Sequence, residues 1–145
     1  MISVLLATHP RYLDHDTGSG HPERPDRLHA VVRGIERAGL ADALIPLEPT
    51  PAPRRAIERV HPRDFVDAIE ASCATGERID ADTVVGPGSW DAARLAAGAG
   101  LVAIERLEAG EAAAGFCAVR PPGHHATPTR AMGFCLLNNV AVTAA

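Results

Sequence analysis

Aromatic residues and cysteines are scarce in this sequence, and both shortages narrow the possible structures. Three Phe, one Tyr and one Trp make up 3% of the 145 residues, whereas alanine is abundant, which predicts closely packed helices. The three cysteines, Cys73, Cys117 and Cys135, are odd in number and widely separated, which argues against a disulfide scaffold. No CxxC pair occurs, so a structural zinc knuckle is not expected.

The sequence also lacks an excess of positive charge and long hydrophobic runs. Asp and Glu outnumber Lys and Arg by 18 to 14, which gives a net charge of −4, and without a basic block nothing favours nucleic acid or an anionic membrane. No apolar run is long enough to span a bilayer. The first residues, MISVLLATHPRY, lack the basic start and the long apolar stretch of a signal peptide. We therefore expect a cytoplasmic protein that binds neither nucleic acid nor membrane.

The sequence does contain an alternation of short apolar runs and amphipathic segments. Its 145 residues, 46% of them hydrophobic, fit one folded domain. Apolar residues spaced by three and four positions predict helices, and short apolar runs that end in polar or Pro-rich segments predict strands. The predicted strands are 2–7, 43–49 and 115–119, and the predicted helices are 26–40, 54–61, 62–76, 90–110 and one that begins near 138.

This alternation predicts an α/β fold with a parallel sheet and helices on both faces. Ligands of such sheets bind beyond the carboxyl ends of the strands. Only about four strands are visible, and the last segment, NNVAVTAA at 138–145, lacks the usual signals of a helix end. We therefore expect the N-terminal part of a larger fold, with a small complete α/β domain as the alternative.

Residues 120–135, RPPGHHATPTRAMGFC, follow the predicted strand 115–119 and hold the most informative pattern. Histidine exchanges its proton near neutral pH, so a fixed pair such as His124 and His125 could divide acid and base duties. The two prolines restrict the backbone before the pair and Gly123 permits a bend, which would orient both rings in advance. Gly-Phe-Cys returns nine residues after His124, and its glycine would allow close approach.

Other interpretations of these residues stay open. The pair could be two surface histidines, one of them hydrogen-bonded to the backbone. Cys117 or Cys135 near His125 could form a nucleophilic site, although cysteines in apolar runs are commonly core residues with a normal or raised pKa. A metal site made of both histidines and both cysteines is also conceivable, although the spacing matches no standard zinc pattern.

Four motifs, in order, resemble those of the histone deacetylase and acetylpolyamine amidohydrolase superfamily, in its bacterial and class II form. They are GHPERPDRL at 20–28, DTVVGPGSWDAARLAAGA at 82–99, RPPGHHA at 120–126 and MGFCLLNNVAVTAA at 132–145. Together they extend over nearly the whole chain. The resemblance implies a three-layer α/β/α fold of the arginase and deacetylase type, and a zinc-dependent hydrolase that acts on acetyl-lysine or acetylated amines.

The resemblance also implies roles for the histidine loop. His125 would be the general base that takes a proton from the attacking water and later protonates the leaving amine. His124 would be its electrostatic and hydrogen-bonding partner. Phe134 would form one wall of the tube around the lysine-like stem, and Gly133 would contact the methylenes of that stem.

Three further candidates come from the same resemblance. Asp82 matches a rim carboxylate that holds the substrate backbone, or it is a loop residue before Thr83. Arg27 matches a buried arginine that lines an internal channel, or it is a solvated helix residue. Pro22, together with Glu23, would shape the first rim loop.

The other histidines are not expected to take part in catalysis. Those interpreted as loop-stabilising residues are His9, His15 and His21. His29 and His61 are expected on the surface, and Ser89 is expected to cap the helix that it precedes.

The resemblance leaves the metal site incomplete. In the family, zinc is held by an Asp-x-His motif and a further Asp, all downstream of the helix that begins near Asn138, and none of these is found before Ala145. We therefore assign no metal ligand and expect residues 1–145 to be the N-terminal portion of a single deacetylase domain, inactive alone. A non-catalytic pseudoenzyme or binding module that retains the substrate loops is the alternative. The implied substrate is an acetylated lysine of a protein or an acetylated small amine.

Overall fold

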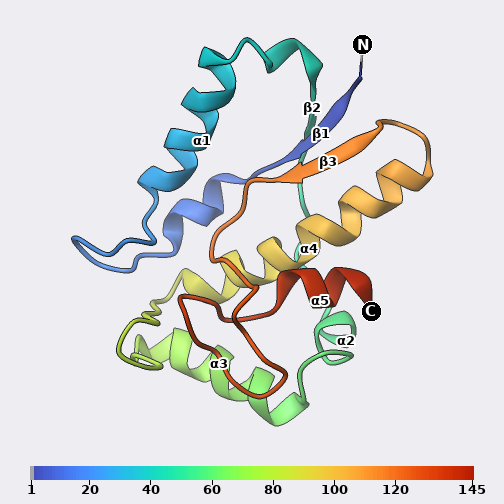
Figure 1. Cartoon of the computed structure of the whole chain (residues 1–145). Coiled ribbons are helices and arrows are strands. Elements are labelled where there is room, and N and C mark those ends of the chain that lie inside the picture. Colours follow the sequence, from blue (N-terminus) through green and yellow to red (C-terminus); the bar gives the residue numbers. More distant parts are fainter. Residues whose placement is uncertain (1) are drawn as a thin grey trace.

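A parallel sheet forms the centre of the protein, whose computed structural model describes residues 2–145 (Figure 1). Its strands are β1 (Val4–Ala7), β2 (Leu44–Leu47) and β3 (Ala114–Cys117). The order is β2-β1-β3, and Val4 aligns with Leu44 on one side and with Ala114 on the other. Within the described residues the sheet thus has three strands, where about four are expected from the sequence.

Each helix lies at a predicted segment, although α2 is shorter than the predicted 54–61. They are α1 (Asp26–Arg37), α2 (Arg54–Ile57), α3 (Arg63–Thr75), α4 (Ser89–Glu108) and α5 (Asn139–Ala144), with short 3₁₀ turns at Pro10–Asp14 and Ala41–Ala43. The glycine after α3, Gly76, has a φ of 71° and ends the helix in the left-handed conformation that glycine adopts at little cost. No helix between residues 2 and 145 combines the length and the hydrophobicity that crossing a membrane requires.

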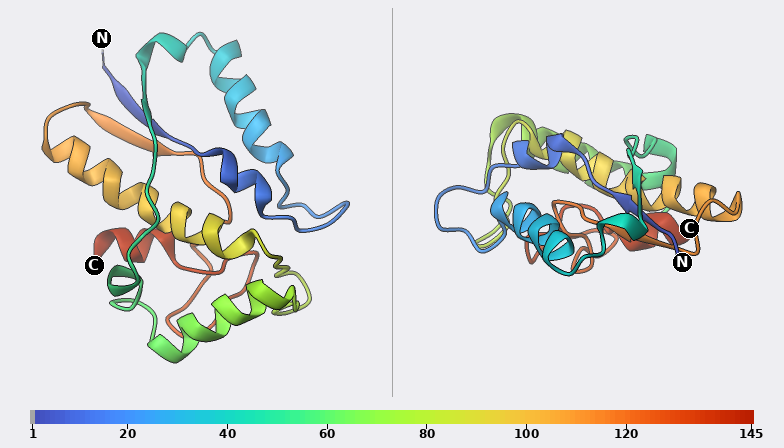
Figure 2. Two further views of the ribbon diagram at one scale, coloured as in Figure 1. Left: turned by 180° about the vertical axis from the view of Figure 1, so that it is seen from behind. Right: turned by 90° about the horizontal axis from the view of Figure 1, so that it is seen from above.

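Helices cover both faces of the sheet (Figure 2). Successive side chains of a strand point to opposite faces: Leu5 packs with Ala99 and Ala103 of α4, whereas Leu6 packs with Leu28 of α1. The predicted α/β architecture, a parallel sheet between helices, is therefore confirmed.

Helix α4 approaches its neighbours closely because small residues line it. A Cβ at Gly98 would overlap the backbone of Thr50, in the loop after β2, and a Cβ at Gly100 would overlap the side chain of Thr143 in α5. Alanines on a further side of α4 form the main core with α3 and with the segment before α5. This packing fixes α5, and with it the loop that leads from β3 to α5.

Candidate active site

The histidine pair lies on the loop after β3, at the carboxyl end of the sheet, where the sequence places it. Gly123 is buried, and a Cβ there would overlap the backbone of Leu137 and Asn139. The Asn139 side-chain amide donates a hydrogen bond of 3.2 Å to the carbonyl oxygen of Pro121. Pro121 itself is fully buried and follows a cis peptide bond. The start of this loop is thus held against the first turn of α5.

Both imidazole rings contact one pocket. The ring centroids of His124 and His125 lie 4.3 Å apart, with the ring planes inclined by 49°. The pocket has a volume of about 310 Å³, and its lining is Pro22, Glu23, Arg27, Pro122, His124, His125, Gly133 and Phe134. Both histidines are exposed, as a surface pair would be. They nevertheless share a concave site with the two residues, Gly133 and Phe134, that the sequence associates with them.

Gly133 packs directly on the ring of His125. It has a φ of 58°, and a Cβ at this position would lie 3.0 Å from Cγ and from Cδ2 of that ring. Phe134 follows with a φ of 69°, and its backbone N–H donates to Oγ1 of Thr83 at 3.3 Å. Cys135 joins the two sides of the loop, because its sulfur accepts the N–H of His125 at 3.5 Å and donates to the carbonyl of Gly133 at 3.3 Å.

His21 and Asp82 lie next to Phe134, outside the lining of the pocket. The ring of His21 meets that of Phe134 edge to face, with centroids 4.9 Å apart. Nε2 of His21 donates to the carbonyl oxygen of Asp82 at 3.0 Å. The carboxylate of Asp82 is exposed, does not line the pocket, and accepts the hydroxyl of Thr83 at 2.9 Å. Asp82 is thus linked to Phe134 through His21, and its rim position and substrate-binding role stay predictions.

Arg27 lines the pocket, but its side chain is 49% exposed, so the expectation of a buried arginine is wrong. The reason is that the guanidinium approaches Glu23 from the solvent side, where it donates to Oε1 at 2.8 Å. The buried arginine of the site is Arg120, which is fully inaccessible. Arg27 and His124 also line an adjoining cavity of about 420 Å³, and the channel role of Arg27 stays a prediction.

Arg120 and Glu23 form a buried two-point ion pair, which the sequence gave no reason to expect. Nε of Arg120 donates to Oε1 at 2.7 Å and Nη2 donates to Oε2 at 2.8 Å. The same guanidinium donates to the carbonyls of Tyr12 and His15 at 2.7 and 2.9 Å. Burial would raise the pKa of Glu23, but hydrogen bonds from Arg120 and its charge hold the pKa below its usual value. Glu23 is therefore ionised and already paired, so it is unsuited to act as a base.

His15 and Ser89 extend this buried network. The N–H of Gly86 donates to Oγ of Ser89 at 2.8 Å, and the same hydroxyl is hydrogen-bonded to Nδ1 of His15 at 2.7 Å. Nε2 of His15 faces Oε2 of Glu23 at 3.5 Å. Burial lowers the pKa of His15 to about 4, so the ring is neutral at physiological pH.

The buried position of Ser89 and His15 decides what these two residues can do. The order serine, histidine, carboxylate is that of a hydrolytic triad, but Ser89 and His15 are both buried, so no substrate reaches the hydroxyl. The expected helix cap is also wrong, because Gly88 holds the capping position and the Ser89 hydroxyl is engaged by Gly86 and His15.

His61 is buried, so its expected surface position is wrong. Its Nδ1 donates to the carbonyl of Pro128 at 3.0 Å, and its Nε2 accepts the N–H of Asn138 at 2.9 Å. The ring stacks on Phe65 with centroids 5.0 Å apart. The physical reason is that the loop between the histidine pair and α5 passes over α3 and needs partners for its backbone groups. His61 supplies both a donor and an acceptor.

The cysteine and metal interpretations find no support within the described residues. Burial raises the pKa of the Cys117 and Cys135 thiols, which disfavours the nucleophilic thiolate. Between residues 2 and 145, no group of three or more His, Cys, Asp or Glu side chains is arranged to hold a metal ion. The residues present therefore do not fit a zinc site.

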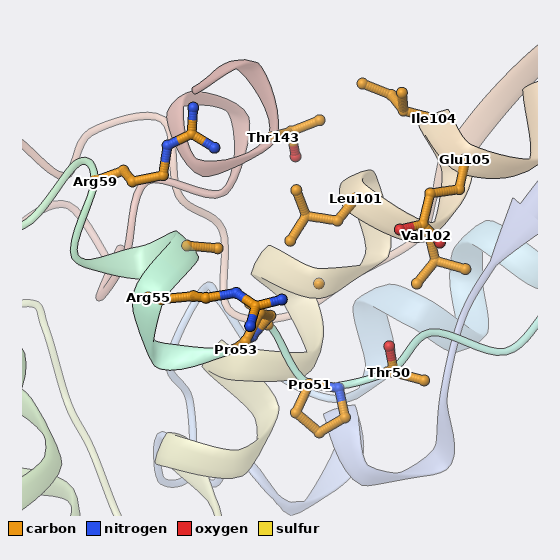
Figure 3. Close-up of a pocket in the computed structure, with 13 residues that line it drawn as sticks. Thr50, Pro51, Pro53, Arg55, Arg59, Leu101, Val102, Ile104, Glu105 and Thr143 are labelled. Carbon is orange, nitrogen blue, oxygen red and sulfur yellow. The ribbon is translucent and has the colours of Figure 1, made fainter. Parts of the chain in front are cut away.

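A separate cavity of about 370 Å³ lies between the loop after β2, α2, α4 and α5 (Figure 3). Its lining is mainly aliphatic, and its charged residues are Arg55, Arg59 and Glu105. The lining contains no histidine, the residue type best suited to proton transfer near neutral pH. The histidine pocket is therefore the better candidate for chemistry.

Comparison with known protein families matches residues 21–145 to the histone deacetylase domain. The chain belongs to the histone deacetylase family. It is 36% identical to a probable deacetylase of Archaeoglobus fulgidus over 139 residues, which are 94% of this chain and 39% of that protein. It is 38% identical to the histone deacetylase-like amidohydrolase of Pseudomonas aeruginosa over 125 residues, 86% of this chain and 33% of that protein.

The fold of this histone deacetylase relative agrees with a solved structure. The crystal structure of the HDA15 HD domain superimposes with a TM-score of 0.89 at 35% sequence identity, over 99% of this chain and 43% of that one. The arginase and deacetylase type of α/β fold is thus confirmed. The chain spans 39%, 21% and 33% of the length of three curated relatives that it matches.

Proposed function

We propose that this chain provides the proton-transfer histidines and part of the substrate slot of a deacetylase that hydrolyses acetylated amines. One observation carries the proposal. Both imidazoles contact the pocket that Phe134 walls, and Gly133 packs against the ring of His125. The membership of the chain in the histone deacetylase family supports the reaction type.

In this proposal His125 removes a proton from the attacking water and returns it to the departing amine. His124, whose ring centroid is 4.3 Å away, is its hydrogen-bonding and electrostatic partner. Glu23 lines the same pocket, but both of its carboxylate oxygens are occupied by Arg120. The proton acceptors left in the lining are therefore the two histidines.

The substrate stem would lie between Phe134 and the first rim loop. Pro22 forms the side of the pocket that comes from this loop, and Gly133 leaves room beside the His125 ring. Asp82 at the rim would bind the backbone of an acetyl-lysine peptide, and Arg27 would line the channel that the adjoining cavity begins. We propose that the substrate is either an acetylated protein lysine or an acetylated small amine, and that the protein is cytoplasmic.

Zinc is expected from the family, but residues 2–145 offer no fitting set of ligands. We therefore assign no step of the reaction to a metal in this chain and propose that further groups come from outside these 145 residues. The isolated chain is then expected to be inactive on an acetyl-lysine peptide with zinc present, and to retain no stoichiometric zinc after purification. Turnover above background would contradict this proposal.

A chimera tests the proposed role directly. Residues 21–145 replace the matching segment of the Pseudomonas aeruginosa amidohydrolase, and hydrolysis of an acetyl-lysine peptide and of an acetylated polyamine is measured. We expect an active chimera in which His125→Ala lowers kcat by roughly 10²–10⁴-fold, the usual contribution of a general base. His29→Ala, at an exposed position on α1, is the control. A folded chimera without activity would instead support a pseudoenzyme or binding module.

A further inference from the structure

The histidine pocket has two walls that come from distant parts of the chain. Pro22 and Glu23 belong to the loop before α1, whereas His124 and His125 belong to the loop after β3. The width of the pocket therefore depends on how these two loops are held together. Arg120 is the residue whose side chain joins them, across a sequence separation of 97 positions.

The connection from Arg120 to the histidines is short and stiff. Only Pro-Pro-Gly separates Arg120 from His124, and proline fixes one of the two backbone dihedral angles at each of its positions. Pro121 is buried, and Gly123 is wedged against the backbone of the segment that enters α5. A displacement of Arg120 would therefore be passed to the histidines rather than absorbed between them.

The connection on the other side is equally direct. Glu23 itself lines the pocket next to Pro22. Its two carboxylate oxygens accept two parallel bonds from Arg120, a geometry that fixes orientation as well as distance. Arg120 also donates to two carbonyls of the preceding turn, those of Tyr12 and His15. The loop before α1 is thus attached to Arg120 at three residues.

We infer that Arg120 and Glu23 are positioning residues, which set the spacing between the first rim loop and the histidine pair. The use of this spacing in catalysis rests on the proposed function. The spacing itself is a property of the chain as it stands, so it is testable without any activity. The specific expectation is that loosening the pair displaces both walls of the pocket while the rest of the protein keeps its fold.

Two ring contacts report the position of these walls in NMR spectra. His21 lies edge to face on Phe134, with centroids 4.9 Å apart, and Gly133 lies against the ring of His125. The ring currents shift the His21 ring protons and the Gly133 α-protons away from their usual positions. The test variant is Arg120→Lys, which keeps the charge but cannot make the two-point bond.

The matched control is Arg54→Lys. Arg54 also binds several carboxylates, those of Glu58, Asp67 and Glu70, but its side chain is 37% exposed and lies on α2, away from the pocket. We expect Arg120→Lys to lose both ring-current shifts while the methyl signals of Val66 and Ile69 in the core keep theirs. Arg54→Lys is expected to leave the His21 and Gly133 signals unchanged.

A folded Arg120→Lys variant with both ring-current shifts intact would overturn the inference. If this variant does not fold, Glu23→Gln, which keeps the shape of the side chain and one acceptor oxygen, takes its place with the same readout. Failure of both variants to fold would also overturn the inference, because the pair would then serve folding alone. An inactive chimera, by contrast, would leave these signals untouched and would count only against the proposed function.

Discussion

Two pairs of histidines in this protein have opposite surroundings. His15 and His61 are buried, and each ring is engaged through both of its nitrogens. His124 and His125 are exposed on the edge of a pocket, their rings lie against each other, and the His125 ring lies against Gly133. The first pair holds loops in place, whereas the second is free to meet a ligand. The residue type is the same, so the difference lies in which polar groups the fold brings to each ring.

Removing the His61 side chain should have the largest effect on stability. In His61→Ala the carbonyl of Pro128 and the N–H of Asn138 both lose their partner. A buried polar group left without a partner costs about 1–3 kcal/mol, so we expect the free energy of unfolding to fall by roughly 2–4 kcal/mol in total. Urea denaturation followed by circular dichroism measures the change.

The control for His61 is His124→Ala, because an exposed substitution usually changes stability by less than about 0.5 kcal/mol. The two variants remove the same side chain, so the difference between them isolates the effect of burial and hydrogen bonding. Equal losses of stability would show that His124 is as structural as His61, and the distinction between the two pairs would fail.

Lowering the pH should reduce the folding stability that the buried histidines His15 and His61 contribute. Burial lowers the pKa of His15 from 6.5 to about 4, and burial also lowers that of His61. Between the folded and unfolded pKa values the unfolded chain binds more protons, so stability falls as the pH drops from about 6.5 toward 4. For His15 the full loss is on the order of 3 kcal/mol, at about 1.4 kcal/mol for each unit of pKa.

Unfolding curves recorded at several pH values measure this effect, and His15→Gln is the variant that isolates it. The glutamine does not titrate, so the slope of stability against pH between 6.5 and 4 should become shallower. Glu23, whose pKa is held below its usual value by Arg120, adds to the slope near the acidic end of this range in both proteins, so the difference between the two slopes is the quantity that reports His15. An unchanged slope in His15→Gln would show that folding does not lower the pKa of His15.

Secondary structure was the part that residue periodicity predicted well. The strand that became β1 and the helices α3 and α4 depend on local spacing of apolar residues, and the structure has them near the expected positions. The position of the histidine pair followed from a rule about parallel sheets. These features depend on neighbours in sequence or on fold class, both of which a sequence displays.

The buried polar groups were not predictable in the same way. Arg120 was not singled out and Glu23 was interpreted only as a rim residue, because charged side chains are rarely buried without a partner. Their partnership joins positions 97 residues apart, and nothing in either local sequence indicates it. The surface interpretation of His61 failed for the same reason, since its partners Pro128 and Asn138 belong to a loop far along the chain.

The smallest and most local effect is expected at Gly133, because this residue lies where residues 133–135 contact the ring of His125. Gly133→Ala adds a Cβ about 3.0 Å from two atoms of the His125 ring, at a φ of 58°. The left-handed conformation alone costs an alanine about 1–2 kcal/mol. We expect a loss of unfolding free energy of about this size, together with a displaced His125 ring signal in NMR spectra.

Gly34→Ala is the matched control, because Gly34 lies within α1 and a Cβ there meets nothing within 4 Å. Alanine at this position should stabilise the protein by about 0.5–1 kcal/mol. If Gly133→Ala instead left both stability and the His125 signal unchanged, the ring would be mobile, and the pocket would lack the fixed base that the proposed reaction needs.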